Sequence, residues 1–198
     1  MPNKIKICGF QDSETLIASL NLGVDFVGLN NIKSSKRFLE QEQILNLLSI
    51  LDAKQKAQVV VLIDVFELDF LNKLLEQGVK LIQDYSNSAE ELIELGFTLI
   101  QVVSVSSKED LNFKATNAEY ILLDTKSNKH LGGSGESFDW SFLADYKASK
   151  QTILAGGINL ENLLKALEYT DFIDIASGAE KDGVKSLPLI EKLVKAIN

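Results

Sequence analysis

Short runs of apolar, mostly β-branched residues alternate along the chain with longer stretches in which leucine and isoleucine recur every three or four positions. The continuous runs are typical of buried parallel strands, and the periodic stretches are typical of amphipathic helices. We predict strands at residues 4–8, 26–29, 59–63, 79–83, 98–103, 120–124, 152–155 and 172–176.

Helices are predicted between these strands. Asp12 is a candidate N-cap for the first helix, and Gly23 follows its last apolar position. Ser88 and Glu91 have the spacing of a capping box for a helix that ends at Gly96. Other predicted helices cover apolar positions within 44–51 and 70–75 and the segments near 107–113, 138–146, 159–167 and 189–197.

Eight units of strand followed by helix, each about 25 residues long, predict a (β/α)₈ barrel that forms a single domain over residues 1–198. The rival architecture is an open, doubly wound sheet. In a barrel the C-terminal ends of all strands meet at one mouth, so polar residues at those ends are the first candidates for chemistry.

Composition narrows the classes of partner. The 198 residues are 45% hydrophobic and 24% charged, as in ordinary globular proteins. A formal net charge of -8 disfavours nucleic acid and anionic membranes as partners, because both need a basic surface. The N-terminus leads into the first strand without a long apolar run, so we expect a cytoplasmic protein.

Cysteine and histidine each occur once, at Cys8 and His130. One cysteine excludes an internal disulfide, and together the two residues are too few for a structural zinc site. Only carboxylates could hold a metal, and we assign no metal ligand. His130 lies between Lys129 and Leu131 in a polar segment, where a solvated side chain is the simplest interpretation.

Several strands are predicted to end in polar residues. Asp124 follows four largely apolar positions, where a carboxylate is costly unless it is paired or catalytic. Cys8 fits either an inert buried thiol or a reactive one. The polar residues expected at the mouth are Cys8, Asp64, Gln83, Asp84, Asp124 and Asp174.

Glycine-rich segments follow the last three predicted strands. In barrels, the loops after the seventh and eighth strands commonly bind phosphate through backbone N–H groups. Arg37, after the second strand, fits either a partner of a substrate carboxylate or a solvated basic loop. The candidate phosphate-binding residues are Gly133, Gly156, Gly157, Ser177 and Gly178.

Six segments resemble, in order and spacing, the phosphoribosylanthranilate isomerase family of tryptophan biosynthesis. They are KICG at 6–9, SKR at 35–37, LLDTK at 122–126, GGSG at 132–135 with FDW at 138–140, AGGINLEN at 155–162 and DIASGAE at 174–180. The resemblance covers nearly the whole chain.

The resemblance implies a cofactor-independent Amadori rearrangement of a small phosphosugar, N-(5-phosphoribosyl)anthranilate. The sequence leaves the oligomeric state open between a monomer and a homodimer. By the same resemblance Asp124 is the general acid that opens the furanose, and Cys8 is the general base that removes the C2 proton. Arg37 and Asp174 match positions that contact the anthranilate or order the site. These roles require a carboxyl that is partly protonated near neutral pH and a thiol that is partly ionised by nearby positive groups.

The chain departs from the family pattern in its first half. It has QDYS at 83–86 where the family usually has QLHG, so Tyr85 replaces a histidine, and Asn30 and Asn31 lie in an unusual segment after the second strand. Two alternatives stay open. One is another phosphosugar isomerase, such as the histidine-biosynthesis aminoaldose isomerase, although its first strand ends in aspartate. The other is a barrel that binds phosphate without turnover.

Overall fold

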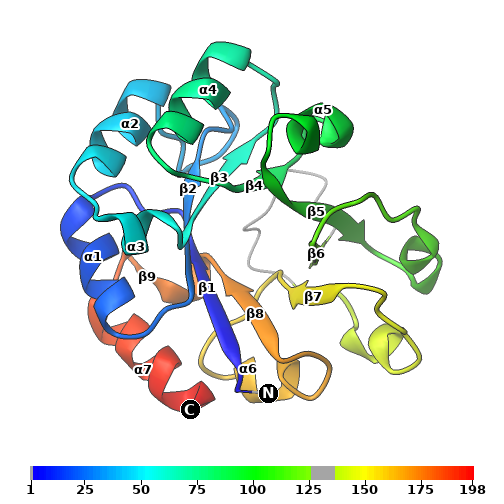
Figure 1. Ribbon diagram of the computed structural model, residues 1–198. Helices are drawn as coiled ribbons and strands as arrows, with labels where there is room; N and C mark the ends of the chain where they lie inside the picture. Colours follow the sequence, from blue (N-terminus) through cyan, green and yellow to red (C-terminus); the bar gives the residue numbers. More distant parts are fainter. Residues whose placement is uncertain (1, 126–136) are drawn as a thin grey trace.

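The computed structural model describes residues 2–125 and 137–198, and its strands close into a barrel (Figure 1). Neighbouring strands pair in chain order and in parallel, and the first strand also pairs with the eighth. This closure confirms the predicted barrel and rules out the open sheet. The strands are β1 (Lys4–Cys8), β2 (Phe26–Asn30), β3 (Val59–Ile63), β4 (Leu81–Asp84), β5 (Thr98–Val105), β6 (Tyr120–Thr125), β7 (Gln151–Leu154) and β8 (Phe172–Ile175).

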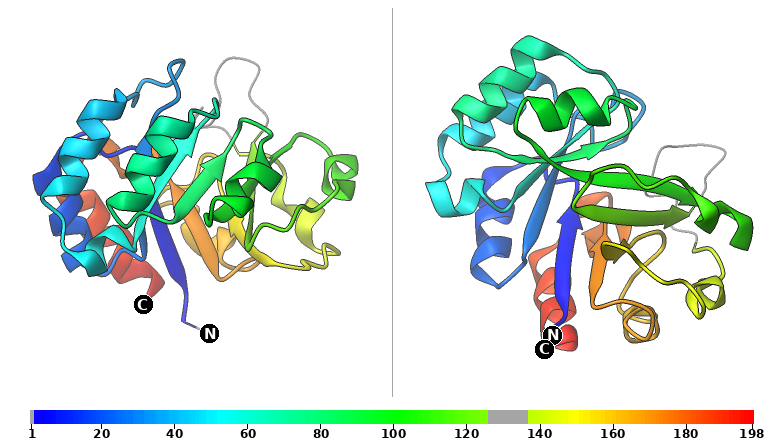
Figure 2. Two further views of the ribbon diagram at one scale, coloured as in Figure 1. Left: turned by 45° about the horizontal axis from the view of Figure 1, so that its top comes forward. Right: turned by 45° about the vertical axis from the view of Figure 1, so that its right-hand side comes forward.

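The longer helices cover the outside of the barrel over β1 to β4, with the C-terminal helix beside the first one (Figure 1). Both chain termini lie at the end of the barrel from which β1 starts (Figure 2). The helices are α1 (Ser13–Asn21), α2 (Gln41–Ser49), α3 (Ala53–Lys56), α4 (Leu68–Glu76), α5 (Ala89–Glu94), α6 (Leu163–Ala166) and α7 (Leu187–Ile197). In the parts of the chain that the structure describes, no helix has the length and apolar character needed to cross a membrane.

Two connections in the second half of the barrel contain short turns where regular helices were predicted. The helices predicted near 107–113 and 138–146 are the 3₁₀ turns η1 (Lys108–Asn112) and η2 (Trp140–Leu143). The first segment has too few apolar residues to bury a full helical face. After β8, a third turn, η3 (Ser177–Ala179), leads into a hairpin of β9 (Glu180–Lys181) and β10 (Val184–Lys185).

Helix starts depend on side-chain caps that are only partly visible in sequence. Asp12 accepts a hydrogen bond from the Thr15 N–H at 2.7 Å, as predicted. The capping box predicted at Ser88 and Glu91 is wrong, because the Ser88 backbone is not extended and its side chain makes no cap bond. Helix α6 starts later than predicted because the side chain of Asn159 accepts the Glu161 N–H, which favours a turn over a helix.

The alternation of side chains along each strand divides the core into two layers. Ile5 and Ile7 point outward under the helices, and Cys8 belongs to the layer inside the barrel. The inner layer is otherwise filled by aliphatic and aromatic side chains, among them Leu62, Leu122 and Phe172. Polar residues at inward positions near the strand ends therefore face the mouth of the barrel.

Candidate active site

A pocket opens at the C-terminal end of the barrel, where the sequence predicted the active site. Residues from the ends of β1, β4, β6 and β8 line it, together with the loops after β2, β7 and β8. Most of the predicted site residues lie in this one pocket. They are Cys8, Arg37, Gln83, Asp124, Gly156, Gly157, Asp174 and Ser177.

The pocket is not lined by Asp64, Asp84 or Gly178, and Gly133 cannot be placed. Gly133 lies outside the described residues, as does His130. Asp64 lies in a bend directly after Ile63 and lines a separate depression, together with residues of the loop after β2 and of α2. Asp84 is one residue past the inward position of Gln83, and its carboxylate accepts hydrogen bonds from the Ser86 N–H and hydroxyl at 2.7 and 2.6 Å. The prediction that Asp64 and Asp84 reach the mouth is therefore wrong.

The carboxyl group of Asp124 is buried at the end of β6, with 8% of the residue exposed. Burial raises its pKa, the charge of Asp174 raises it further, and the pKa reaches about 7. The Thr125 N–H donates to Asp124 Oδ1 at 2.8 Å and fixes the orientation of the group. Near neutral pH a large fraction of Asp124 is protonated and able to give its proton to a ligand.

The thiol of Cys8 lies at the end of β1 and is almost fully buried. Gly28 on the neighbouring strand makes room for it, because a Cβ there would lie 2.7 Å from Cys8 Sγ. Burial raises the pKa of the thiol more than the positive charges of Lys6 and Lys185 lower it. Burial of the thiol therefore opposes the ionisation that the nearby cations were expected to promote.

Lys6 is a site residue that sequence reasoning missed. Its side chain is completely buried inside β1, and its Nζ lies 2.9 Å from Asp174 Oδ1 on the adjacent strand β8. Burial lowers the pKa of Lys6, but the charges of Asp174 and Cys8 outweigh that effect and raise it, so the amine stays positive. The signal in the sequence was its place between Ile5 and Ile7, two positions before Cys8, which puts it inside the barrel.

Replacing Lys6 by methionine is expected to destabilise the protein by about 3–5 kcal/mol, because it leaves the buried Asp174 carboxylate without its partner. Urea unfolding measures the change. The double variant Lys6→Met, Asp174→Asn is the matched control and should recover most of the loss. Equal stability of wild type and the single variant would show that the ion pair does not hold β1 to β8.

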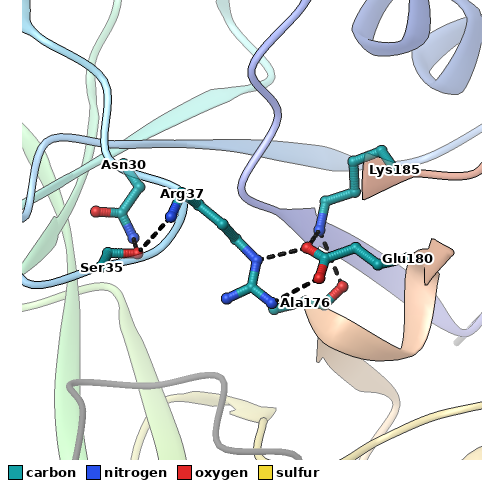
Figure 3. A network of polar contacts seen from close by, with 6 residues as sticks. All are labelled: Asn30, Ser35, Arg37, Ala176, Glu180 and Lys185. Carbon is teal, nitrogen blue, oxygen red and sulfur yellow. Dashed lines mark hydrogen bonds and ion pairs between the residues drawn. The ribbon is translucent and has the colours of Figure 1, made fainter. Parts of the chain in front are cut away.

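Arg37, Glu180 and Lys185 form a second group of charges at the mouth (Figure 3). Arg37 Nη2 donates to Glu180 Oε2 at 2.8 Å, its Nε donates to Oε1, and Lys185 Nζ donates to the same Oε1 at 2.6 Å. Burial raises the pKa of Glu180, but these two cations outweigh it and lower the pKa. The three groups carry a net positive charge, and Glu180 was missed because it is distant from Arg37 in sequence.

The loop after β2 fixes the backbone of Arg37 through a hydrogen bond to Ser35. Ser35 Oγ accepts hydrogen bonds from the Asn30 side-chain amide and from the Arg37 N–H, both at 3.1 Å (Figure 3). Gly9 lets the Arg37 side chain cross β1, because a Cβ there would lie 2.1 Å from Arg37 Cδ and the glycine has φ +93°. Within residues 2–125 and 137–198 the Arg37 Nη1 group has no partner, so it remains available to a ligand.

The loops after β7 and β8 pack against each other. Gly178 allows this contact, because a Cβ there would lie 2.1 Å from the Ile158 carbonyl oxygen. Gly178 therefore serves as packing and does not itself line the pocket, unlike Gly156, Gly157 and Ser177. Among the described residues the N–H groups of these three have no acceptor. N–H groups without an acceptor, in two loops that line the same pocket, suit an anion.

Gln83 and Tyr85 line the pocket from the end of β4. Gln83 Nε2 donates to the Tyr85 hydroxyl at 2.9 Å, and Gln83 is only 2% exposed. Burial, followed by the charges of Asp124 and Cys8, raises the pKa of Tyr85 well above its ordinary value. The pocket thus combines a proton donor, a thiol, an anion site and a neutral phenol.

Comparisons with known proteins agree with this arrangement. Residues 5–196 match the family model for N-(5'phosphoribosyl)anthranilate (PRA) isomerase. The N-(5'-phosphoribosyl)anthranilate isomerase of Streptococcus pneumoniae is 29% identical over 98% of this chain and 95% of its own length. The crystal structure of the Thermotoga maritima phosphoribosyl anthranilate isomerase superposes with a TM-score of 0.81, at 25% identity and 98% coverage of both chains.

A further phosphoribosyl anthranilate isomerase structure, in complex with reduced 1-(o-carboxyphenylamino)-1-deoxyribulose 5-phosphate, gives a TM-score of 0.77. It is 24% identical and is covered over 97% of its chain and 98% of this one, so it supports the fold. The family match extends from β1 into α7 and so includes the strand ends and loops that form the pocket. The chain belongs to the N-(5'-phosphoribosyl)anthranilate isomerase family.

Proposed function

We propose that the protein catalyses the Amadori rearrangement of N-(5'-phosphoribosyl)anthranilate to 1-(2-carboxyphenylamino)-1-deoxyribulose 5-phosphate, a step of tryptophan biosynthesis. Membership of the family supports this activity. The observation that carries it is that Asp124, with a pKa of about 7, shares one pocket with Cys8 and with residues of two loops whose N–H groups have no acceptor among the described residues. An acid, a base and a phosphate site are the parts that the reaction needs.

In the first step the Asp124 carboxyl group donates its proton to the ring oxygen of the furanose. The bond between C1 and the ring oxygen breaks, and the lone pair of the anthranilate nitrogen forms a double bond to C1. The product is an open-chain, positively charged Schiff base. Burial of Asp124 supports this role because it keeps the proton on the group until the oxygen accepts it.

In the second step the Cys8 thiolate removes the proton from C2. The electron pair of that C–H bond forms the C1–C2 double bond, and the nitrogen becomes neutral. C1 then gains a proton while the 2-hydroxyl loses one, which gives the ketone. Lys6, whose amine stays positive beside Asp174, stabilises the thiolate during this step.

The two ends of the substrate require different partners. The N–H groups of Gly156, Gly157 and Ser177 bind the phosphate, while Gly178 holds the two loops together. Arg37 contributes the positive charge of its free Nη1 group, and Asp174 orders Lys6 and raises the pKa of Asp124. The Arg37 side chain is positioned by Glu180, so the loops after β2 and β8 cooperate in binding.

Product analysis in heavy water tests this proposal. Freshly generated N-(5'-phosphoribosyl)anthranilate should give the ketose phosphate with one deuterium at C1, because the proton added there comes from solvent. Nuclear magnetic resonance of the product reports both the ketone and the label. Anthranilate and ribose 5-phosphate as the only products would mean that hydrolysis, and not isomerisation, had occurred.

A further inference from the structure

Gln83 and Tyr85 are not used by the reaction steps above. Both line the pocket, and the amide nitrogen of Gln83 donates to the phenol oxygen of Tyr85 at 2.9 Å. The amide oxygen of Gln83 is buried and has no hydrogen-bond partner among residues 2–125 and 137–198. A buried acceptor without a partner destabilises a protein, so its presence in a pocket requires an explanation.

The hydrogen bond between the two side chains decides what they offer to a ligand. Because the phenol oxygen accepts from Gln83, its own proton is directed elsewhere, and no described residue accepts it. Gln83 Oε1 remains open as an acceptor. The pair therefore presents one donor and one acceptor side by side. The raised pKa of Tyr85 keeps its phenol neutral, so the phenol acts as a hydrogen-bond donor and not as an ionised base.

Barrel geometry decides which half of the substrate this pair meets. The strands follow one another in order around the closed barrel, so β4 lies four strands away from β8, on the opposite side. The loops that suit phosphate follow β7 and β8. The end of β4 therefore faces the part of the ligand that is farthest from the phosphate.

Anthranilate has the complementary groups on adjacent ring carbons, an N–H that donates and a carboxylate that accepts. We propose that Tyr85 donates its phenolic proton to the anthranilate carboxylate while Gln83 Oε1 accepts the anilino N–H. This assignment rests on the proposed function. It makes Tyr85 a specificity-determining residue and Gln83 both a ligand to the substrate and the group that orients Tyr85.

The variant Tyr85→Phe removes only the hydroxyl group. It should lower kcat/KM for N-(5'-phosphoribosyl)anthranilate by about ten- to a hundredfold, the effect of one hydrogen bond to a charged group. Tyr120→Phe is the matched control. Tyr120 begins β6 at the other end of the barrel, where its ring packs against Phe26 and Phe172, and this variant should keep wild-type kcat/KM.

Inhibition by inorganic phosphate separates recognition of the anthranilate from general damage to the site. The inhibition constant should be the same for wild type and Tyr85→Phe, because phosphate binds at the far side of the pocket. Unchanged kcat/KM in Tyr85→Phe, or a phosphate inhibition constant that rises along with the loss of kcat/KM, would overturn the proposal.

Gln83→Met tests the unpartnered amide oxygen. Methionine fills a similar volume without a polar atom, so the melting temperature without ligand should stay the same or rise while kcat/KM falls. A lower melting temperature with unchanged kcat/KM would make Gln83 a structural residue and contradict its role here. Failure of the proposed function would be recognised separately, since the wild-type protein itself would then not convert N-(5'-phosphoribosyl)anthranilate.

Discussion

Replacing Asp124 by asparagine should abolish isomerisation and, at pH 8, raise the free energy of unfolding. Asparagine is close in size to aspartate and still accepts the Thr125 N–H, but it has no acidic proton to give to the furanose oxygen. The expected loss in kcat is at least two to four decades, the usual contribution of a general acid. Turnover assays and urea unfolding on the same preparation measure both effects.

The sign of the stability change follows from the pKa of Asp124. Burial raises it from 3.8 to about 7, so between these values the folded protein binds more protons than the unfolded chain. The contribution of Asp124 to the free energy of unfolding is therefore fully present below about pH 4. It falls as the pH rises and reaches its minimum above pH 7. Asparagine does not ionise, so Asp124→Asn does not lose this stability as the pH rises. At pH 8 the free energy of unfolding of the variant should exceed that of wild type by at most about 4 kcal/mol.

Inorganic phosphate supplies the control for Asp124→Asn. Because the loops after β7 and β8 are untouched, phosphate should raise the melting temperature of wild type and variant equally. A variant with wild-type kcat would remove Asp124 from the acid role. A variant less stable than wild type at pH 8 would show that the ionised Asp124 carboxylate does not destabilise the folded protein.

The second large effect is expected from Cys8→Ser, which should lose two to four decades of kcat. The serine hydroxyl fits the space beside Gly28, but it is far less acidic than a thiol and does not supply the base. Rapid mixing of enzyme in excess over substrate measures the chemical step directly. An unchanged rate would mean that another group or a water molecule removes the C2 proton.

The pH profile of wild-type kcat/KM is the companion measurement. Activity needs the acid form of Asp124 and the thiolate of Cys8, whose pKa is raised by burial. The profile should therefore rise to a maximum above pH 7 and fall again above the pKa of the thiol. The descending limb at high pH should persist when Tyr85 is replaced by phenylalanine, because the phenol is not a base in this account.

The barrel was predictable because its strands are buried on both faces and so appear as continuous apolar runs. Every predicted strand is present, with ends displaced by no more than two residues. The positions of Cys8 and Asp124 followed from the same pattern, since both end such runs. The capping box at Ser88 failed because sequence spacing does not fix the backbone angles that a cap requires.

The contacts between residues of the site were harder to predict from the sequence. Lys6 escaped notice because lysine is seldom buried, and only closure of β1 against β8 places it on Asp174. Arg37 and Glu180 are joined by folding across most of the chain, so no local motif indicates their contact. The direction of the Cys8 pKa depends on a balance between burial and charge that only the packed structure contains.

The most direct test of the account is the conversion of freshly generated N-(5'-phosphoribosyl)anthranilate, followed by the loss of anthranilate fluorescence, with wild type and Asp124→Asn in parallel. Wild type should convert the substrate rapidly, and the variant should show no conversion above the spontaneous rate. Conversion by wild type at only the spontaneous rate, or equal conversion by both proteins, would contradict it.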